Sequence, residues 1–134
     1  MIVVDSSAWI EFFRRTGSRV NRSLARLVRE RAELAVTELV VLEVLAGATS
    51  ARQFGTLRAA LVGFPVLPLR GLAAYERAAH LYQACRLGGE AVRKVTDCLV
   101  AVAAIEGNAT VLHADRDFEK LARHTPLRTE PLDE

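Results

Sequence analysis

The sequence predicts an α/β fold in which helices cover both faces of a mostly parallel sheet of four or five strands. Short apolar runs with strand character alternate along the chain with helical patterns. The apolar residues make up 51% of the 134 residues and are mainly Ala, Val and Leu, which suits helices packed on buried parallel strands. This length and composition predict a single domain over residues 1–134 with its own hydrophobic core.

In the first half of the chain, strands and helices are expected to alternate. The expected elements are a strand at 2–4, a helix at 7–14, a basic amphipathic helix at 19–31, a strand at 34–36, a helix running to Gly47 and another running to about Val62. Ser6 or Ser7 can cap the first helix, and Thr37 and Ser50 can cap the last two, because hydroxyl groups accept hydrogen bonds from first-turn amides. Gly47 is a suitable C′ residue.

The second half repeats the alternation. The expected elements are a strand at 66–69, a helix from about 72 to 87, a helix running to Glu106, a strand at 109–113, a short helix and a further strand at 127–129. Pro65 and Pro68 limit the strand between them, and Gly88-Gly89 end the long helix. Thr96 and Asp115 are expected to cap the two later helices.

Composition excludes several classes of protein. A net charge of +2 is too small to indicate nucleic-acid binding by itself. Cys85 and Cys98 do not form a C-x-x-C pair, so neither a disulfide framework nor a zinc site is expected, and a reducing cytoplasm fits. The apolar run before Asp5 is too short for a signal peptide. No apolar run reaches about 18 residues, so no membrane span is expected.

Two aspartates directly follow predicted strands. Asp5 comes after the first strand, and Asp115 comes after the strand that ends at His113. In open parallel sheets, ligands bind beyond the carboxyl ends of the strands, where the strand order reverses. If these two strands are neighbours, the two aspartates meet at that point. The alternative is that each aspartate only caps a helix.

Two further acids lie in apolar surroundings. Glu43 in "LVVLEVLAG" and Asp97 at the start of "DCLVAVAAIEG" belong to helices that are apolar almost all round. A buried carboxylate needs an arginine, a proton or a metal. An arginine partner for Glu43 and a helix-capping role for Asp97 are the alternatives, although Thr96 is available as the cap. Asp117 either faces the same site or simply favours the helix dipole.

Carboxylates without His or Cys suit hard cations such as Mg²⁺ or Mn²⁺. Without a cation, the like charges would raise each other's pKa. With cations, such a site activates water and stabilises both oxygens of an in-line displacement at phosphorus. The acids therefore predict metal-dependent phosphodiester hydrolysis. Arg93 and Lys94 lie just before Asp97 and either contact RNA phosphates or belong to a solvated loop. Arg22, Arg26 and Arg29 form a helical stripe; such a stripe is more often a solvated face, and contact with RNA or a protein partner is the alternative.

Four segments, "VVDSSAWIEFF", "ELVVLEVLAG", "RLGGEAVRKVTDCLVAVAA" and "VLHADRDFEKLA", resemble in order and spacing the PIN domain. More narrowly, they resemble the VapC-type toxins of bacterial toxin–antitoxin pairs. Each segment alone is weak evidence, but four in sequence over nearly the whole chain are specific. The resemblance implies a three-layer α/β/α fold and a Mg²⁺- or Mn²⁺-dependent endoribonuclease. It also implies a homodimer and a small VapB-type antitoxin that blocks the site. The RNA could be tRNA, ribosomal RNA or mRNA.

The resemblance also assigns roles to individual residues. Asp5 and Asp97 match the principal metal ligands, Asp115 completes the cluster, and Glu43 matches the acid that helps to hold the metal or orients its water. Asp117 matches an additional acid.

The same resemblance matches Ser6 to the hydroxyl after the first aspartate, although Ser7 is also within reach in the sequence. Arg93 is the candidate contact to the RNA substrate.

Two other functions compete with a ribonuclease. A receiver-type signalling domain is also a small parallel α/β fold with Mg²⁺-binding acids. It would need an aspartate after its middle strand and a lysine after a late strand, and neither residues 66–70 nor "PLRTEP" provides them. A catalytically idle RNA-binding module is the other alternative, and the intact acids argue against it.

Overall fold

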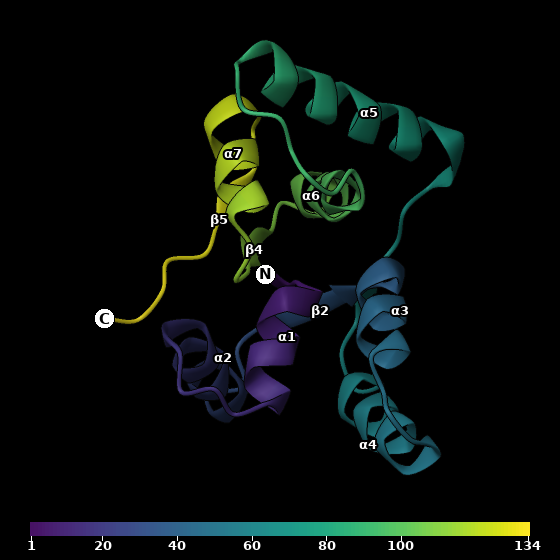
Figure 1. The fold of residues 1–134 in the computed structure, drawn as a ribbon, viewed down its shortest axis with the longest axis vertical. Coiled ribbons are helices and arrows are strands. Elements are labelled where there is room, and N and C mark those ends of the chain that lie inside the picture. The colour runs from purple at the N-terminus through teal and green to yellow at the C-terminus, as the bar shows by residue number, and fades with distance from the viewer.

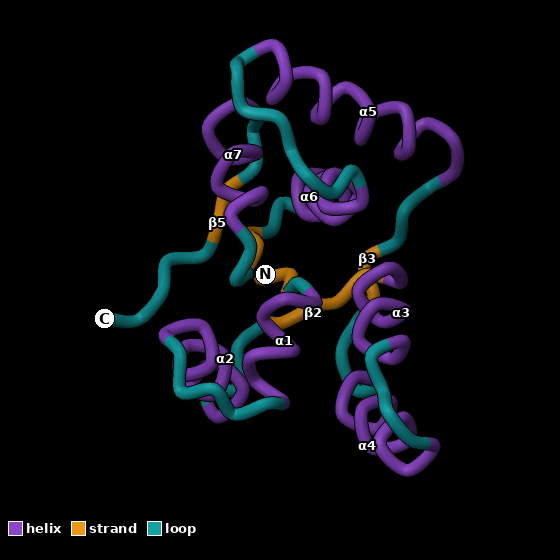
Figure 2. The backbone as a smooth tube through the Cα atoms, in the orientation of Figure 1, coloured by secondary structure: helices purple, strands orange, loops and turns teal.

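The computed structural model describes residues 1–134 and contains a five-stranded sheet in which every strand pair is parallel (Figure 2). The strand order is β3-β2-β1-β4-β5. The strands are β1 (Ile2–Val4), β2 (Leu34–Thr37), β3 (Val66–Leu67), β4 (Thr110–Leu112) and β5 (Arg128–Thr129). The expected parallel α/β class is therefore confirmed, including the fifth strand.

Seven helices surround the sheet. They are α1 (Ser6–Phe13), α2 (Arg19–Arg29), α3 (Glu38–Ala46), α4 (Ala51–Leu61), α5 (Gly71–Leu87), α6 (Thr96–Glu106) and α7 (Arg116–His124). In Figure 1, α5, α6 and α7 lie above the sheet, while α1, α2 and α4 lie below it. Helix α3 follows β2 directly and contacts α1 and α4. This arrangement is the expected three-layer fold. None of the seven helices combines the length and the hydropathy that a membrane-spanning segment needs.

The strands at the centre of the sheet are buried on both faces, as their unbroken apolar sequences predict. The fully buried strand residues include Val3, Val4, Val36, Val111 and Leu112. Burying an aliphatic side chain of this size contributes roughly 1.5–3 kcal/mol. Helix α6 packs against β4 and is buried on nearly all sides. The strands and α6 therefore form a rigid support for the residues that follow or precede them.

The ends of three elements differ from the expectation. Asp5, and not a serine, caps α1 by accepting a hydrogen bond from the Ser7 amide. Thr96 does not cap α6, because Val95 already has helical dihedral angles and Thr96 therefore lies inside the first turn. Gly47 is the C-cap of α3 with an ordinary φ of −80°, so it is not a left-handed C′ residue.

The strand order places the switch point between β1 and β4. The chain builds β1, β2 and β3 in one direction and returns to the other side of β1 for β4. The Asp5 amide donates to the Leu112 carbonyl at 3.0 Å, so the ends of the two strands lie side by side. A receiver-type domain has the strand order 2-1-3-4-5. The observed order excludes that alternative.

Candidate acidic site

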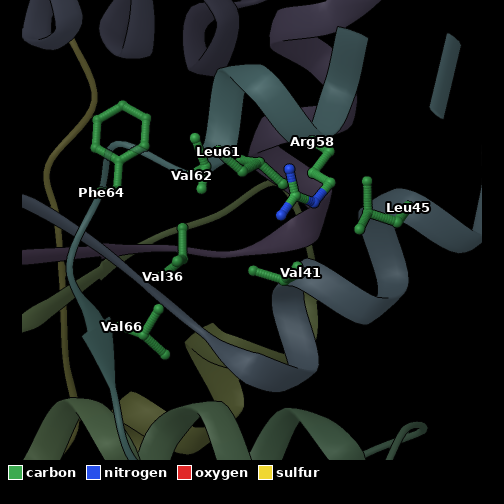
Figure 3. A pocket seen from close by; sticks show the side chains of 8 residues that line it. All are labelled: Val36, Val41, Leu45, Arg58, Leu61, Val62, Phe64 and Val66. Atoms are coloured by element: carbon green, nitrogen blue, oxygen red, sulfur yellow. The ribbon is translucent and has the colours of Figure 1, made fainter. Parts of the chain in front are cut away.

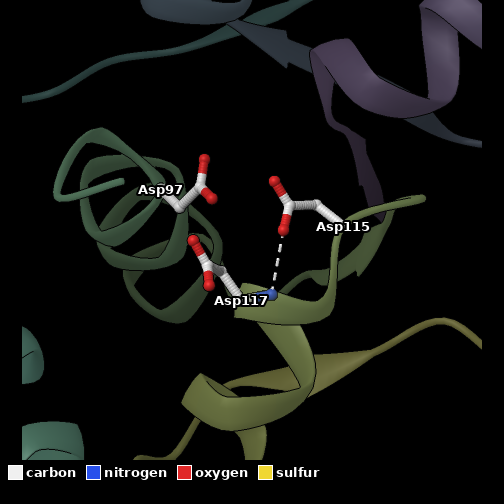
Figure 4. Close-up of side chains that lie close together, drawn as sticks. All are labelled: Asp97, Asp115 and Asp117. Atoms are coloured by element: carbon white, nitrogen blue, oxygen red, sulfur yellow. Dashed lines mark hydrogen bonds between the residues drawn. The ribbon is translucent and has the colours of Figure 1, made fainter. Parts of the chain in front are cut away.

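Three carboxylates converge at the switch point (Figure 4). Asp97 comes from the first turn of α6, and Asp115 and Asp117 come from the start of α7. One oxygen from each side chain lies within 4.8 Å of the others. They meet because α6 and α7 contact each other beside the carboxyl end of β4.

Asp5 divides its two carboxylate oxygens between two environments. Oδ2 accepts hydrogen bonds from the Ser7 amide at 3.0 Å and from the Ser7 hydroxyl at 2.6 Å. Oδ1 is buried and has no hydrogen-bond partner. Burial raises the pKa of Asp5, although the hydrogen bonds from Ser7 oppose this rise. The cap therefore accounts for only one oxygen of a carboxylate that is completely buried.

Asp97 is the second acid with an unpaired buried oxygen. Its side chain is 2% exposed, its Oδ2 atom has no partner, and its Oδ1 atom lies 3.6 Å from Nζ of Lys94. Burial, followed by the negative charge of Asp5, raises the pKa of Asp97 to about 8. Buried polar atoms without partners are rare in folded proteins and call for an explanation. Capping does not provide one, because α6 has no side-chain cap.

Glu43 lies beside Asp5 but is only partly buried. The expectation of a helix buried on all sides is wrong for α3: Val40 and Val44 enter the core, whereas Leu42 is 62% exposed. The Ser6 hydroxyl donates to Oε1 of Glu43 at 3.3 Å, and no arginine pairs with this carboxylate. Burial and then the charge of Asp5 raise the pKa of Glu43.

Asp115 and Asp117 are satisfied to different extents. Asp115 caps α7 by accepting a hydrogen bond from the Asp117 amide at 3.0 Å (Figure 4). Asp117 is completely buried, and its Oδ2 atom accepts from the amides of Arg93 and Lys94, both at 3.1 Å. Its Oδ1 atom lies 3.2 Å from Nζ of Lys120. Burial acts to raise the pKa of Asp117, but these hydrogen bonds prevail and hold it below its usual range.

Lys94 lies closer to the acids than its sequence position indicated. Its Nζ atom is 3.4 Å from Asp115 and 3.6 Å from Asp97. Burial lowers the pKa of Lys94, but the charges of Asp97, Asp115, Asp5 and Glu43 outweigh this effect and raise it. The negative charges of all four main acids therefore act on this one ammonium group. The only hint in the sequence was the three-residue spacing to Asp97.

The two serines have separate roles. Ser6 faces Glu43, whereas Ser7 donates to Asp5 and accepts from the Ala114 amide at 2.9 Å. Ser7 therefore fastens the start of α1 to the loop between β4 and α7. The sequence alone does not decide which serine is a helix cap and which is a site hydroxyl. The deciding contact joins Ser7 to Ala114, which is more than 100 residues away in the chain.

The basic residues also separate. Arg93 is 72% exposed, and its guanidinium lies 3.5 Å from Asp115 and 3.8 Å from Asp117, so it belongs to the site. Arg26 instead forms a bidentate ion pair with Asp133, and Arg22 donates to the Gly17 carbonyl. Most of the arginine stripe on α2 is therefore engaged in holding the C-terminal tail and the preceding loop.

The donor set fits a hard divalent cation. The site offers carboxylate oxygens only, and two of them, Oδ1 of Asp5 and Oδ2 of Asp97, are buried without partners. A pocket of about 250 Å³ between α3, α4 and β3 is lined almost entirely by apolar side chains, and none of the acids is among its lining residues (Figure 3). Fold and site together define a three-layer α/β/α protein with a buried acidic cluster at the switch point of its sheet.

Comparisons with known proteins agree with this class. The family model described as the PIN domain matches residues 2–124. A VapC ribonuclease of Mycobacterium bovis and ribonuclease VapC11 of Mycobacterium tuberculosis are each 40% identical over 129 residues, which cover 96% of this chain and 96% of theirs. The chain belongs to the PIN-domain family and to the VapC group within it.

Solved structures share the fold at lower sequence identity. VapBC2 from Rickettsia felis, crystallised with a DNA fragment from its promoter, has a TM-score of 0.75 and 17% identity, with 99% of this chain and 100% of that chain covered. VapC20 of Mycobacterium tuberculosis, described as a toxin that cleaves the sarcin-ricin loop, has a TM-score of 0.70 and 16% identity, with 96% and 99% covered.

Proposed function

We propose that this chain is a VapC-type toxin that cleaves RNA phosphodiester bonds as a divalent-metal-dependent endoribonuclease. One observation carries the proposal: Asp97, Asp115 and Asp117 cluster at the switch point, and buried oxygens of Asp97 and of the neighbouring Asp5 have no hydrogen-bond partner. Membership of the PIN-domain family and the 40% identity to proteins named ribonucleases support it. The proposed enzyme is a single domain over residues 1–134 that acts in the cytoplasm.

Each acid is given a role that matches its surroundings. Asp5 and Asp97 are the principal ligands of Mg²⁺ or Mn²⁺, because each has a buried oxygen free for a cation. Asp115 completes the cluster, and Glu43, held by the Ser6 hydroxyl, orients a water or contacts the metal. When bound, the ion supplies an activated water and stabilises charge on the phosphate oxygens.

Two neighbouring residues assist without being principal ligands. Asp117 fixes the backbone of Arg93 and Lys94, since its oxygens already accept hydrogen bonds. Arg93 is exposed at the edge of the acids and contacts an RNA phosphate, which positions the strand without reading its sequence.

A VapB-type antitoxin and a second copy of the chain are the proposed protein partners. The solved structure of VapBC2, a toxin–antitoxin pair, supports the first of these. The apolar pocket in Figure 3 offers a place for an apolar side chain of an antitoxin beside the cationic Arg58. A separate surface on α3 and α5 supports the second copy of the chain. It exposes Leu42, Leu72 and Tyr75 by 62%, 73% and 54%, and exposed apolar patches often mark protein–protein interfaces.

The test is cleavage of cellular RNA by the purified protein with Mg²⁺, Mn²⁺ or EDTA. Wild type should cleave only with a divalent cation, and Asp97→Asn should be slower by at least about a hundredfold, because it loses a metal-binding charge. The matched control is Glu76→Gln, which changes an exposed, unpaired acid on α5 and should cleave normally. Cleavage by Asp97→Asn at the wild-type rate, or full activity in EDTA, would refute the proposal.

The class of RNA needs a separate experiment. Sequencing the new RNA ends after brief induction in cells would show whether tRNA, ribosomal RNA or mRNA is cut. The same cells carrying Asp97→Asn supply the background, so ends that appear with both proteins do not come from this site.

A further inference from the structure

A second pocket lies directly beside the acids. It measures about 500 Å³, within the range of ligand-binding pockets, and it is lined by Ser7, Arg93, Ala114, Asp115, Arg116 and Lys120. The pocket shares Asp115 with the acidic site, and its Ser7 wall is hydrogen-bonded to Asp5. A group bound in this pocket would therefore be an immediate neighbour of a group bound at the acids.

Three of the lining side chains are cationic. Arg116 is exposed and forms no hydrogen bond or ion pair through its side chain. Arg93 is 72% exposed and only loosely paired, at 3.5 Å from Asp115 and 3.8 Å from Asp117. Lys120 donates to Asp117 and to the Ala91 carbonyl. The pocket thus has one free guanidinium and another that is mostly exposed, and a guanidinium matches phosphate oxygens in a bidentate geometry.

The loop that carries Arg93 is built onto α7. The Asp117 carboxylate accepts from the Arg93 and Lys94 amides, and further contacts follow at intervals of about one helical turn. Lys120 binds the Ala91 carbonyl. Arg123 and His124 both bind the Glu90 carboxylate, with distances of 2.6–2.9 Å.

Residues 90–94 are therefore held along the helix that also presents Arg116. The contacts fix the backbone that carries Arg93 beside the start of α7, so both guanidinium groups line the same pocket. The amides at the start of α7 are not part of this site, because Asp115 already accepts from the amides of Asp117 and Phe118.

We propose that this pocket binds the RNA phosphate next to the scissile phosphodiester, with Arg116 and Arg93 as its ligands. The proposal rests on the ribonuclease function proposed above and adds a subsite to it. Phosphates follow one another along an RNA strand, so a strand with one phosphate at the acids must place another nearby. The cations also offset the repulsion between the acids and an approaching anionic strand. Such a subsite holds the backbone in place without selecting a base.

The test compares wild type with Arg116→Ala, Arg116→Lys and Arg52→Ala. Steady-state cleavage of a fluorescent single-stranded RNA is measured with Mg²⁺ at several salt concentrations. Arg116→Ala should raise KM by roughly tenfold with kcat unchanged, and should reduce the slope of log(kcat/KM) against log[salt] by about 1. Arg116→Lys should keep the salt slope, because it keeps the charge. Arg52 is exposed and unpaired on α4, so Arg52→Ala should match wild type.

The two proposals fail in different ways. If wild type cleaves RNA but Arg116→Ala keeps the wild-type KM and salt slope, the subsite is wrong and the ribonuclease stands. Equal losses for Arg116→Ala and Arg52→Ala would also overturn the subsite, because they would reflect only the overall charge. If wild type cleaves nothing, fluorescence anisotropy of the same labelled RNA in EDTA still tests the subsite through binding alone. Arg116→Ala should bind the RNA more weakly than wild type and with a smaller salt slope. Unchanged binding would overturn the subsite.

Discussion

Asp5 and Asp115 each use one carboxylate oxygen to cap a helix and leave the other for the acidic site. Oδ2 of Asp5 and Oδ1 of Asp115 accept first-turn amides, whereas Oδ1 of Asp5 is unpaired and Oδ2 of Asp115 lies 3.4 Å from Lys94. The cap fixes the carboxylate plane, and so it determines where the second oxygen points. For these residues a capping role and the proposed metal-binding role are compatible, because the cap positions the oxygen that would bind the metal.

The raised pKa of Asp97 predicts how the metal-free protein responds to pH. The pKa is about 8 in the folded chain against an ordinary value of 3.8, so the folded state retains a proton that the unfolded state has released. Between pH 4 and 8, this difference should lower stability as the pH rises. Residue 97 cannot ionise in Asp97→Asn, so in EDTA at pH 8 this variant should melt at a higher temperature than wild type. The difference should be roughly 4 °C for each kcal/mol gained in the free energy of unfolding.

Thermal unfolding of both proteins in EDTA at pH 5 and pH 8 measures this effect. The advantage of Asp97→Asn should be smaller at pH 5, where the wild-type carboxyl is mostly protonated. Mg²⁺ at pH 8 should raise the melting temperature of wild type more than that of the variant. If wild type and Asp97→Asn melted at the same temperature at pH 5 and also at pH 8, the surroundings of Asp97 would not raise its pKa.

At the scale of elements, α7 positions the loop before α6. Asp117 is the main link, because it accepts hydrogen bonds from two backbone amides of that loop. Asp117→Ala would leave the partly buried amides of Arg93 and Lys94 without this partner and should lower the free energy of unfolding by about 1–3 kcal/mol. Its affinity for Mn²⁺ should fall less than that of Asp97→Asn.

Urea unfolding and calorimetric titration with Mn²⁺ separate these two effects. The control is Glu119→Ala, which removes from the same helix an exposed acid that contacts His113 and not the loop before α6. A variant at Asp117 that remained as stable as wild type but no longer bound Mn²⁺ would show that Asp117 is a metal ligand and not an anchor for the loop.

Sequence patterns predict some elements well and others poorly, for physical reasons. Sequence patterns single out Asp5, Asp97 and Asp115 because each follows or begins a strongly apolar element. A carboxylate buried there requires a partner. The exposure of one side of α3 is not predicted, because its exposed face carries apolar side chains just as its buried face does. The sequence therefore does not tell the two faces apart. The role of Lys94 is missed because it depends on a loop path fixed by Asp117, which lies 23 residues away.

At the scale of the whole molecule, the exposed apolar surface of α3 and α5 predicts self-association. Leu42, Leu72 and Tyr75 all contribute to it, and Leu42 and Tyr75 also line one pocket of about 260 Å³. Wild type should sediment as a dimer, and Leu42→Glu should sediment as a monomer with unchanged circular dichroism, because a buried charge at the interface is costly. Leu87→Glu is the control, since Leu87 is 86% exposed at the far end of α5. A monomeric wild type would contradict the prediction.

The strand order is also a property of the whole molecule, and the sequence determines it only in part. Alternating strands and helices predict a parallel sheet, but they do not predict that β1 pairs with β4. That pairing is only the condition under which Asp5 and Asp115 meet. The structure meets that condition through the register in which Val4 pairs with Leu112. No pattern within either strand specifies its neighbour, since both are short and uniformly apolar.

The acids at the switch point are proposed to act as a divalent-metal centre, and anomalous scattering from crystals soaked in Mn²⁺ tests this most directly. We expect an anomalous peak in contact with Oδ1 of Asp5 and Oδ2 of Asp97, the two buried oxygens without partners. The peak should disappear in crystals of Asp97→Asn. No peak at these oxygens at saturating Mn²⁺, or a peak that persists unchanged in Asp97→Asn, would contradict the account.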